Sequence, residues 1–194
     1  LWVVDLADGT RHELPLDQLE DIALDPFAAL REAAEEPALE GPRPVWLARH
    51  AFSPDGQRLA LSLESVDDKD RWLVEWDLAK AELAPVHHEH DEAWVSWGRS
   101  AIGYTVGHQL WFTTEASGFN HLHVRDEDGV ERELTSGRWE VREPFTDRAG
   151  RWVYFEGNPT ELVTWELHRV EVASGEREQL TFLGGVNRGQ LSPD

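Results

Sequence analysis

Ser53-Pro54-Asp55-Gly56, followed by Leu59-Ala60-Leu61 and then by Trp72-Leu73-Val74-Glu75-Trp76-Asp77, is the stretch that decides the fold of this chain. It reads as a turn that ends in glycine, an apolar strand, a polar break, a second strand and an acidic turn. The block returns with Gly107, residues 110–112 and residues 121–126, and again with Gly150, residues 152–155 and residues 167–171. The glycines lie 51 and 43 residues apart, and the closing acidic residues Asp77, Asp126 and Glu171 lie 49 and 45 residues apart.

The ends of the blocks keep a similar spacing. Asp128-Gly129 precedes Leu134-Thr135, Ser174-Gly175 precedes Leu180-Thr181, and the two Leu-Thr pairs are 46 residues apart. Asp-Gly and Ser-Gly favour hairpin turns because glycine accepts a positive φ. At the N-terminus, Leu1 to Asp5 with Asp8-Gly9 matches the back half of a block. At the C-terminus, Gln190-Leu191-Ser192-Pro193-Asp194 matches the opening that begins at Phe52.

A repeat of about 45 residues built from short strands is typical of a β-propeller, whose blades have four strands each. The sequence therefore predicts an all-β fold: an incomplete β-propeller of four-stranded antiparallel blades. We expect three nearly whole blades, half of a fourth at the front and the start of another at the end. A closed propeller has about four to eight blades, and the chain contains no methionine, so we expect residues 1–194 to be a piece of a longer polypeptide. The alternative is a generic β-sandwich with chance similarity between its parts.

Composition narrows the classes of partner. The net charge of −20 argues against binding to nucleic acids or to anionic membranes, both of which need a basic face. It is compatible with a solvated surface, or with a cavity that attracts cationic groups such as peptide N-termini. The absence of cysteine excludes disulfides and cysteine-based zinc sites. No apolar run approaches 18 residues, so no membrane span is predicted. We expect a bacterial protein of the cytoplasm or periplasm, and the sequence leaves the compartment open.

Residues 17–45 interrupt the strand pattern. Asp25-Pro26 is a favourable helix start, with Asp25 as the expected N-cap, so the sequence predicts a short helix over residues 25–36. Ile22, Phe27 and Leu30 form its expected apolar stripe, and Pro37 with residues 41–44 ends it. This helical insertion is interpreted as a surface excursion, with a lid over a neighbouring active site as the alternative.

No catalytic, cofactor-binding or metal-binding residue is assigned from the sequence. The run His87-His88-Glu89-His90-Asp91-Glu92 resembles a metal site in composition, but we expect it to be a solvated polar loop. His121 and His123 alternate along a strand, and packing between blades is their expected role. The closest approach to a hydrolase nucleophile elbow is Gly98-Arg99-Ser100-Ala101-Ile102, in which Gly103 comes one residue too late. No cofactor is expected.

The sequence contains ten tryptophans, for which we expect two structural roles. Large flat side chains fill the gaps between radially packed sheets, which is the role expected for five tryptophans on predicted strands: Trp72, Trp76, Trp111, Trp152 and Trp165. Trp94, Trp97 and Trp139 are placed on strands that open blades, nearest a central channel. We therefore predict that these three line a cavity.

Residues 111–141 carry a more specific signal. They contain Glu115, Gly118, Phe119, His121 and Leu122, and then Leu134, Thr135, Gly137, Trp139, Glu140 and Val141. This resembles the segment Glu-x-x-Gly-[Phe/Tyr]-x-His-[Leu/Ile], followed by Leu-Thr-x-Gly-x-Trp-Glu-Val, in the dipeptidyl peptidase IV branch of the prolyl oligopeptidase family. The resemblance covers about residues 46–194, and the insertion lies outside it.

The resemblance implies the N-terminal propeller of a two-domain serine peptidase. The Ser-Asp-His triad would lie in an α/β-hydrolase domain downstream of residue 194, and peptides would be the substrates. The propeller would limit entry to short peptides and shape the cavity that binds them. The family's pair of amine-binding glutamates is not assigned to Glu35-Glu36, because the surroundings do not match that motif, and the sequence leaves dipeptidyl specificity open. A non-enzymatic scaffold for protein interaction or envelope assembly is the alternative function. The isolated piece is expected to self-associate through its uncovered sheet faces.

Overall fold

The computed structural model describes residues 1–96 and 98–192, which form three four-stranded antiparallel sheets and one two-stranded sheet. We call the four-stranded sheets the first, second and third blades. The first blade has the order β3 (Val45–Phe52), β4 (Arg58–Ser65), β5 (Asp70–Asp77) and β6 (Glu82–His90). The second has β7 (Ile102–Tyr104), β8 (Leu110–Thr114), β9 (His121–Arg125) and β10 (Glu131–Glu133). The third has β11 (Val141–Thr146), β12 (Trp152–Gly157), β13 (Glu166–Glu171) and β14 (Arg177–Gln179).

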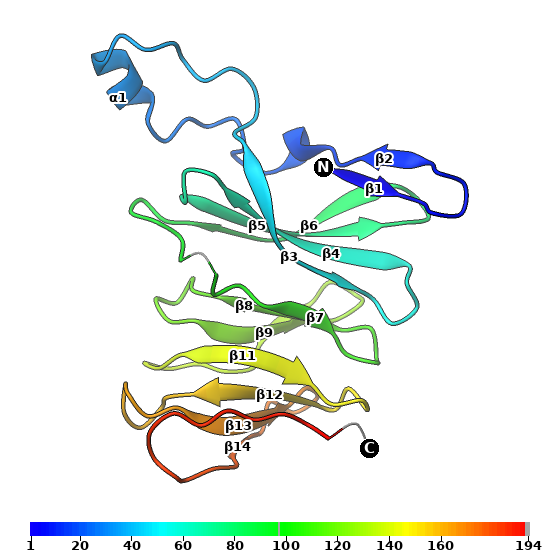
Figure 1. Ribbon diagram of the computed structural model, residues 1–194, viewed down its shortest axis with the longest axis vertical. Helices are drawn as coiled ribbons and strands as arrows, with labels where there is room; N and C mark the ends of the chain where they lie inside the picture. Colours follow the sequence, from blue (N-terminus) through cyan, green and yellow to red (C-terminus); the bar gives the residue numbers. More distant parts are fainter. Residues whose placement is uncertain (97, 193–194) are drawn as a thin grey trace.

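The blades are stacked face to face along the long axis of the molecule (Figure 1). A leading half-blade, β1 (Trp2–Val4) paired with β2 (Arg11–Glu13), packs on the outer side of the first blade. Every strand of each blade pairs with the next strand in the sequence, so each blade is a simple meander. This is the strand order that the repeated block predicts.

Glycine is not the common feature of the turns that open the repeats. Three residues occupy the left-handed position of these turns: Gly56 with φ 69°, His108 with φ 63° and Gly150 with φ 66°. The structural repeat therefore places His108, and not Gly107, opposite the other two glycines. At Gly150 a side chain is also excluded, because a Cβ would lie 2.5 Å from the Val106 backbone nitrogen of the neighbouring blade.

Three apolar clusters hold the stack together, one between each pair of neighbouring sheets. Trp72, Val74 and Trp76 of β5 pack against the half-blade and the insertion. Leu73 from the opposite face of β5 meets Phe112 of β8 in the second cluster. The largest joins the second and third blades and includes Trp111, Leu122, Val124, Trp139, Val153, Phe155 and Val170. Alternation along each strand supplies both faces with apolar side chains, as a sheet covered on both sides requires.

The repeated Leu-Thr pairs extend the outer edge of two blades. Thr135 Oγ1 accepts a hydrogen bond from the Leu122 backbone N–H at 2.9 Å. Thr181 Oγ1 accepts one from the Leu167 N–H, also at 2.9 Å. The hydroxyls thus continue the ladder past the ends of β10 and β14, which explains why the pair recurs.

The segment between β2 and β3 contains a 3-10 turn, η1 (Leu16–Gln18), and one short helix, α1 (Ala28–Ala33). The helix is shorter than predicted, and its N-cap position is Phe27, so the prediction of Asp25 as N-cap is wrong. Asp25 instead accepts the Phe27 N–H at 2.9 Å and pairs with Arg31, which shapes the turn before the helix. The expected apolar stripe is also incomplete, because Ile22 is buried whereas Leu30 is 67% exposed on a helix that projects from the stack (Figure 1).

Candidate functional site

A cleft of about 420 Å³ opens along the first strands of the three blades. It is bounded by the β3 side chain Arg49, by the start of β7 and by the bulged part of β11. The lining is mixed: three arginines and one glutamate stand beside Ala101, Ile102 and Pro144. A volume of this size accommodates a few residues of a peptide, so we take this cleft as the candidate functional site.

The β11 wall of the cleft is shaped by a β-bulge. The pairing of β11 with β12 shifts between Arg142 and Phe145. Glu143, inside the bulge, has φ 49°, a left-handed conformation that is uncommon for a residue with a side chain. Bulges re-aim side chains and are common next to functional sites. Here the bulge brings the exposed Glu143 and its neighbour Arg142 to the cleft together.

Arg142 is held on two sides. Its Nε donates to Glu156 Oε2 at 2.6 Å, and its guanidinium carbon lies 3.8 Å from the centre of the Trp165 ring. Its Nη2 group is buried and has no hydrogen-bond partner among the described residues, whereas the side chain as a whole is 35% exposed. The guanidinium is therefore fixed in position with hydrogen-bonding capacity left over.

The other two arginines differ in their pairing. Arg99 forms an ion pair with Glu140. Arg49 donates to the Ala48 carbonyl at 2.8 Å and to the Gly98 carbonyl at 3.4 Å, and makes no carboxylate ion pair among the described residues. Of the three arginines that line the cleft, Arg49 is thus the one whose hydrogen-bond acceptors are all neutral.

The back of the cleft contains two more polar atoms without partners. Asn120 is 1% exposed; its amide donates to the Val141 carbonyl at 2.7 Å, but its Oδ1 accepts no hydrogen bond. The Nε1 of Trp111 also has no partner. Gly103 lies against this indole so closely that a Cβ would overlap the ring. Unsatisfied buried polar groups are rare, and each one marks a place with spare hydrogen-bonding capacity.

A buried ionic row fixes the chain on one side of the cleft. Arg71 donates to Glu64 at 3.1 Å and to Glu89 at 3.0 Å, and also to the Ser96 carbonyl. These three charged residues are cross-strand neighbours on β4, β5 and β6. The row anchors the segment from the first to the second blade, where Arg99 lies. Burial raises the pKa of the nearby Glu115, which accepts the Ser96 N–H at 3.2 Å.

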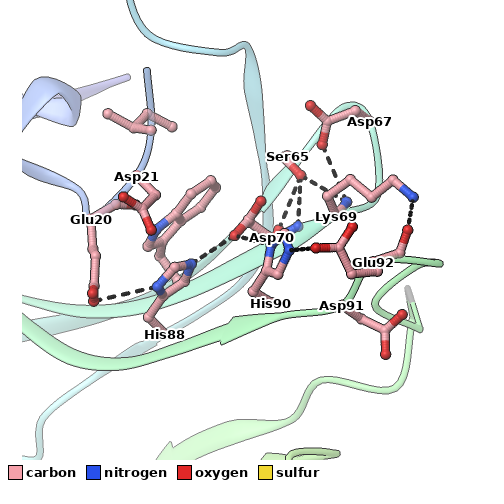
Figure 2. A network of polar contacts seen from close by, with 12 residues as sticks. Glu20, Asp21, Ser65, Asp67, Lys69, Asp70, His88, His90, Asp91 and Glu92 are labelled. Atoms are coloured by element: carbon pink, nitrogen blue, oxygen red, sulfur yellow. Dashed lines mark hydrogen bonds and ion pairs between the residues drawn. The ribbon is translucent and has the colours of Figure 1, made fainter. Parts of the chain in front are cut away.

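The histidine run does not lie in a loop as predicted, because residues 87–90 form the end of β6 and pair with β5. His88 Nε2 and His90 Nδ1 lie 2.8 and 2.9 Å from Asp70 Oδ1 (Figure 2). Burial raises the pKa of Asp70, but the hydrogen bonds from His88, Arg43 and His90 outweigh it and lower the pKa to about 2. In the part of the chain that the structure describes, no three histidine, aspartate or glutamate side chains are grouped so that they could hold a metal ion.

The Asp70 network fastens the insertion to the first blade. Arg43 pairs with Asp70 at 2.7 Å and donates to the Ile22 and Asp21 carbonyls at 3.4 and 3.2 Å. Glu20 lies 3.4 Å from His88 in the same network (Figure 2). These contacts have a structural role, away from the cleft.

The motif residues that suggested a family build the junction between the second and third blades. His121 is fully buried, lies 3.1 Å from Thr135 Oγ1 and 2.9 Å from the Gly137 carbonyl, and packs edge-on against Trp139. His123 lies 2.8 Å from Glu131 and stacks near Phe112. His121 packs between blades, as expected. His123 contacts two residues of its own blade, and its ring centre lies 6.5 Å from that of His87 in the first blade.

Of the three tryptophans expected to line a cavity, the two that the structure describes do not do so. Trp94 and Trp139 lie outside strands, Trp94 is 68% exposed, and Trp139 is buried in the core between blades. Trp97 lies outside the described residues. Two of the five tryptophans assigned to packing, Trp111 and Trp165, do border the cleft. Trp111 reaches the cleft from β8, whereas Trp165 comes directly before β13.

Two other candidates stay without a chemical role. Ser100 is buried, and its hydroxyl donates to Glu64 at 3.4 Å, so it supports the connection to the second blade. Glu36 pairs with Arg31 at 3.3 Å on the exposed end of α1, and Glu35 is the left-handed residue there. Sequence reasoning missed Arg49, Arg142 and Glu143, and only the Glu-Pro step at the bulge hinted at the irregularity of β11.

Comparison with known proteins gives a family and a fold. The family model described as "Dipeptidyl peptidase IV (DPP IV) N-terminal region" matches residues 30–194. The chain is similar to the crystal structure of Porphyromonas gingivalis dipeptidyl peptidase 4, with a TM-score of 0.71 and 19% identity over 98% of this chain and 24% of that chain. A putative dipeptidyl aminopeptidase IV from Bacteroides ovatus matches with a TM-score of 0.59 and 17% identity, over 71% of this chain and 22% of that chain.

TolB from Acinetobacter baumannii is also similar, with a TM-score of 0.56 and 15% identity over 93% of this chain and 37% of that chain. The chain thus spans about a quarter of the length of the two peptidases. At these identities the structures show the fold alone. The fold class predicted from the repeat, an incomplete propeller of four-stranded blades with one short helix, is confirmed, as is the predicted resemblance. Within the described residues, none of the helices has the length and apolar character that crossing a membrane requires.

Proposed function

Because the chain belongs to the family of dipeptidyl peptidase IV N-terminal regions, we propose that it is the non-catalytic propeller of a serine peptidase of the prolyl oligopeptidase family. In this proposal the propeller covers an α/β-hydrolase domain that lies downstream in the same polypeptide. The hydrolase domain supplies the serine nucleophile, and the propeller decides which substrates reach it. Peptides are the substrates, and the two domains are each other's main partner.

The observation that carries this proposal is the cleft along β3, β7 and β11. The first strands of successive blades converge there, and the bulge in β11 turns charged side chains toward it. Its volume of about 420 Å³ admits a short extended peptide but not a folded domain. The buried Glu64–Arg71–Glu89 row keeps one wall rigid, as a size filter needs.

A fluorophosphonate probe on the complete polypeptide tests the proposal. We expect covalent labelling of one serine outside residues 1–194. We also expect that peptides of a few residues are cleaved, whereas a folded protein that contains the same peptide sequences is cleaved little. Substitution of the labelled serine by alanine serves as the control. Absence of labelling in a correctly folded complete protein would overturn the proposal.

A non-enzymatic interaction scaffold is the second candidate function. It is favoured by the exposed apolar side chains at the half-blade end, where Trp2 is 58% and Phe52 57% exposed. An unlabelled complete protein that binds a partner through this end would support the scaffold instead.

A further inference from the structure

We infer that the cleft between β3, β7 and β11 binds the carboxylate group of a short peptide, with Arg49 and Arg142 as its cationic ligands. The peptide nature of the ligand rests on the proposed function, whereas the recognition of a carboxylate rests on the cleft itself. The two can therefore fail separately.

The lining of the cleft is richer in basic side chains than the molecule as a whole. The chain carries a net charge of −20, yet the cleft is lined by three arginines and a single glutamate. Only Arg99 and Arg142 have carboxylate partners there, Glu140 and Glu156. A cleft with low-dielectric walls concentrates such a local field. Glu140, Glu156 and Glu143 balance the three arginines in number, so the attraction for an anionic group comes from Arg49, whose acceptors are carbonyls, and not from a net positive charge of the cleft.

Arg142 has the geometry of a carboxylate ligand. The ion pair with Glu156 and the stacking on Trp165 fix its guanidinium plane. The fixed plane reduces the side-chain entropy lost on binding, and the guanidinium fork matches the two oxygens of a carboxylate. Nη2 is buried and has no acceptor among the described residues, so a small shift of the side chain that brings Nη2 to the cleft lets a ligand oxygen supply a hydrogen bond that these residues do not.

Arg49 and Glu143 define how the ligand is oriented. Arg49, with only carbonyl acceptors, provides the second positive charge from the opposite wall. Glu143, which makes no ion pair among the described residues, places one negative charge in the same cleft. A peptide with one carboxylate is accepted at the arginines, whereas a second carboxylate near Glu143 is repelled. The apolar side chains Ile102 and Pro144 cover the rest of the peptide.

The test compares acetyl-trialanine with its carboxamide, by NMR titration of the complete polypeptide at low salt. The acetyl group removes the free amine, so amine recognition does not contribute. We expect the free acid to bind about fivefold to tenfold more tightly than the amide, the gain of a hydrogen-bonded ion pair in a half-open site. Arg49→Gln and Arg142→Gln should each bring this ratio close to one.

Three further variants keep the test decisive. Arg148→Gln removes an exposed arginine outside the cleft and should preserve the ratio. Arg142→Lys keeps the charge for Glu156 but loses the fork, and should give an intermediate ratio. Glu143→Gln should raise affinity for the acid and leave the amide unchanged, a gain that misfolding cannot produce. Equal binding of acid and amide by the natural protein overturns the inference, as does a ratio unaffected by both Gln variants. Serine labelling is read separately, so its failure leaves this result intact.

Discussion

Buried histidines in this molecule are of two kinds. His121 has a partner for each ring nitrogen, whereas neither nitrogen of His168 makes a hydrogen bond to the described part of the chain. His168 is 1% exposed and stacks on Phe155 with ring centres 5.5 Å apart. Burial, with the charge of Arg177 adding to it, lowers the pKa of His168 to about 4. His168 therefore packs as a neutral aromatic side chain, and its protonation destabilises the folded state.

The low pKa of His168 predicts acid sensitivity. Between its ordinary value of 6.5 and about 4, the unfolded chain binds a proton that the folded chain does not. Stability should therefore fall as the pH is lowered through this window, by on the order of 2 kcal/mol from this residue. His168→Leu should flatten that part of the curve, as measured by urea unfolding at a series of pH values. Replacement of the exposed His50 by Gln is the control; an equal effect of the two changes would contradict the prediction.

The repeated threonines allow a matched comparison at a single atom. Thr135→Val removes the hydroxyl that accepts the Leu122 N–H and contacts His121, and leaves a buried donor unpaired. We expect a loss of about 1–3 kcal/mol in the free energy of unfolding. Thr181→Val makes the same change where the threonine is only half-buried, and should cost less. Chemical denaturation of both variants measures the difference, and a reversed order would speak against the role assigned to Thr135.

At the scale of elements, the insertion is held by one buried cation. Arg43 is 3% exposed and connects Asp70 and Asp67 of the first blade with two carbonyls of the insertion. Trp72 adds a hydrogen bond from its Nε1 to the Glu20 carbonyl at 2.8 Å. Beyond this clamp α1 projects from the blades and contributes no buried residue to the core (Figure 1). The insertion is therefore fastened at its base, and Phe27 adds a contact with the first blade, where Lys69 Nζ lies 5.6 Å from the centre of its ring.

Breaking the clamp should release the insertion. Arg43→Met leaves the buried Asp70 carboxylate without its arginine partner. Such a change lowers the free energy of unfolding by about 3–5 kcal/mol in comparable buried pairs. We expect faster proteinase K cleavage within residues 20–44, while fragments that contain the blades persist. Arg31→Met, which removes only half-exposed ion pairs on α1, should cost far less. Cleavage at the same rate in both variants would show that Arg43 does not hold the insertion.

At the scale of the whole molecule, the stack has uncovered apolar surface at the half-blade end. Trp2, Leu47 and Phe52 lie there with a surrounding groove of about 300 Å³. The edge of β1 is unpaired among the described residues. Exposed apolar surface beside a free strand edge favours association with another chain.

We therefore predict that residues 1–194 in isolation form oligomers. Sedimentation velocity should show a species larger than the monomer, and the double change Trp2→Glu and Phe52→Glu should shift it toward the monomer. Leu30→Glu, on the projecting helix and 67% exposed, should not. A stable monomer at micromolar concentration would refute the prediction.

Much of the fold follows from local pattern. Turn residues, alternating apolar strands and the repeated Leu-Thr pairs predict the blades in their order, because a meander pairs each strand with its neighbour in sequence. The prediction fails where strand pairing overrides the polarity of the sequence. The polar residues His87–His90 suggested a loop, but they pair with β5 and form a strand. It also fails at α1, where the helix begins after the Asp25 turn.

The sequence by itself determined the class of fold, the order of the blades and the family, since each depends on residues close together in the chain. The cleft was decided only by tertiary structure. Arg49 and Arg142 come from the first strands of different blades, and their approach depends on how whole sheet faces pack across the apolar clusters. The bulge that turns Glu143 inward is likewise set by pairing with β12. Packing between sheets joins residues distant in sequence, and no short pattern records it.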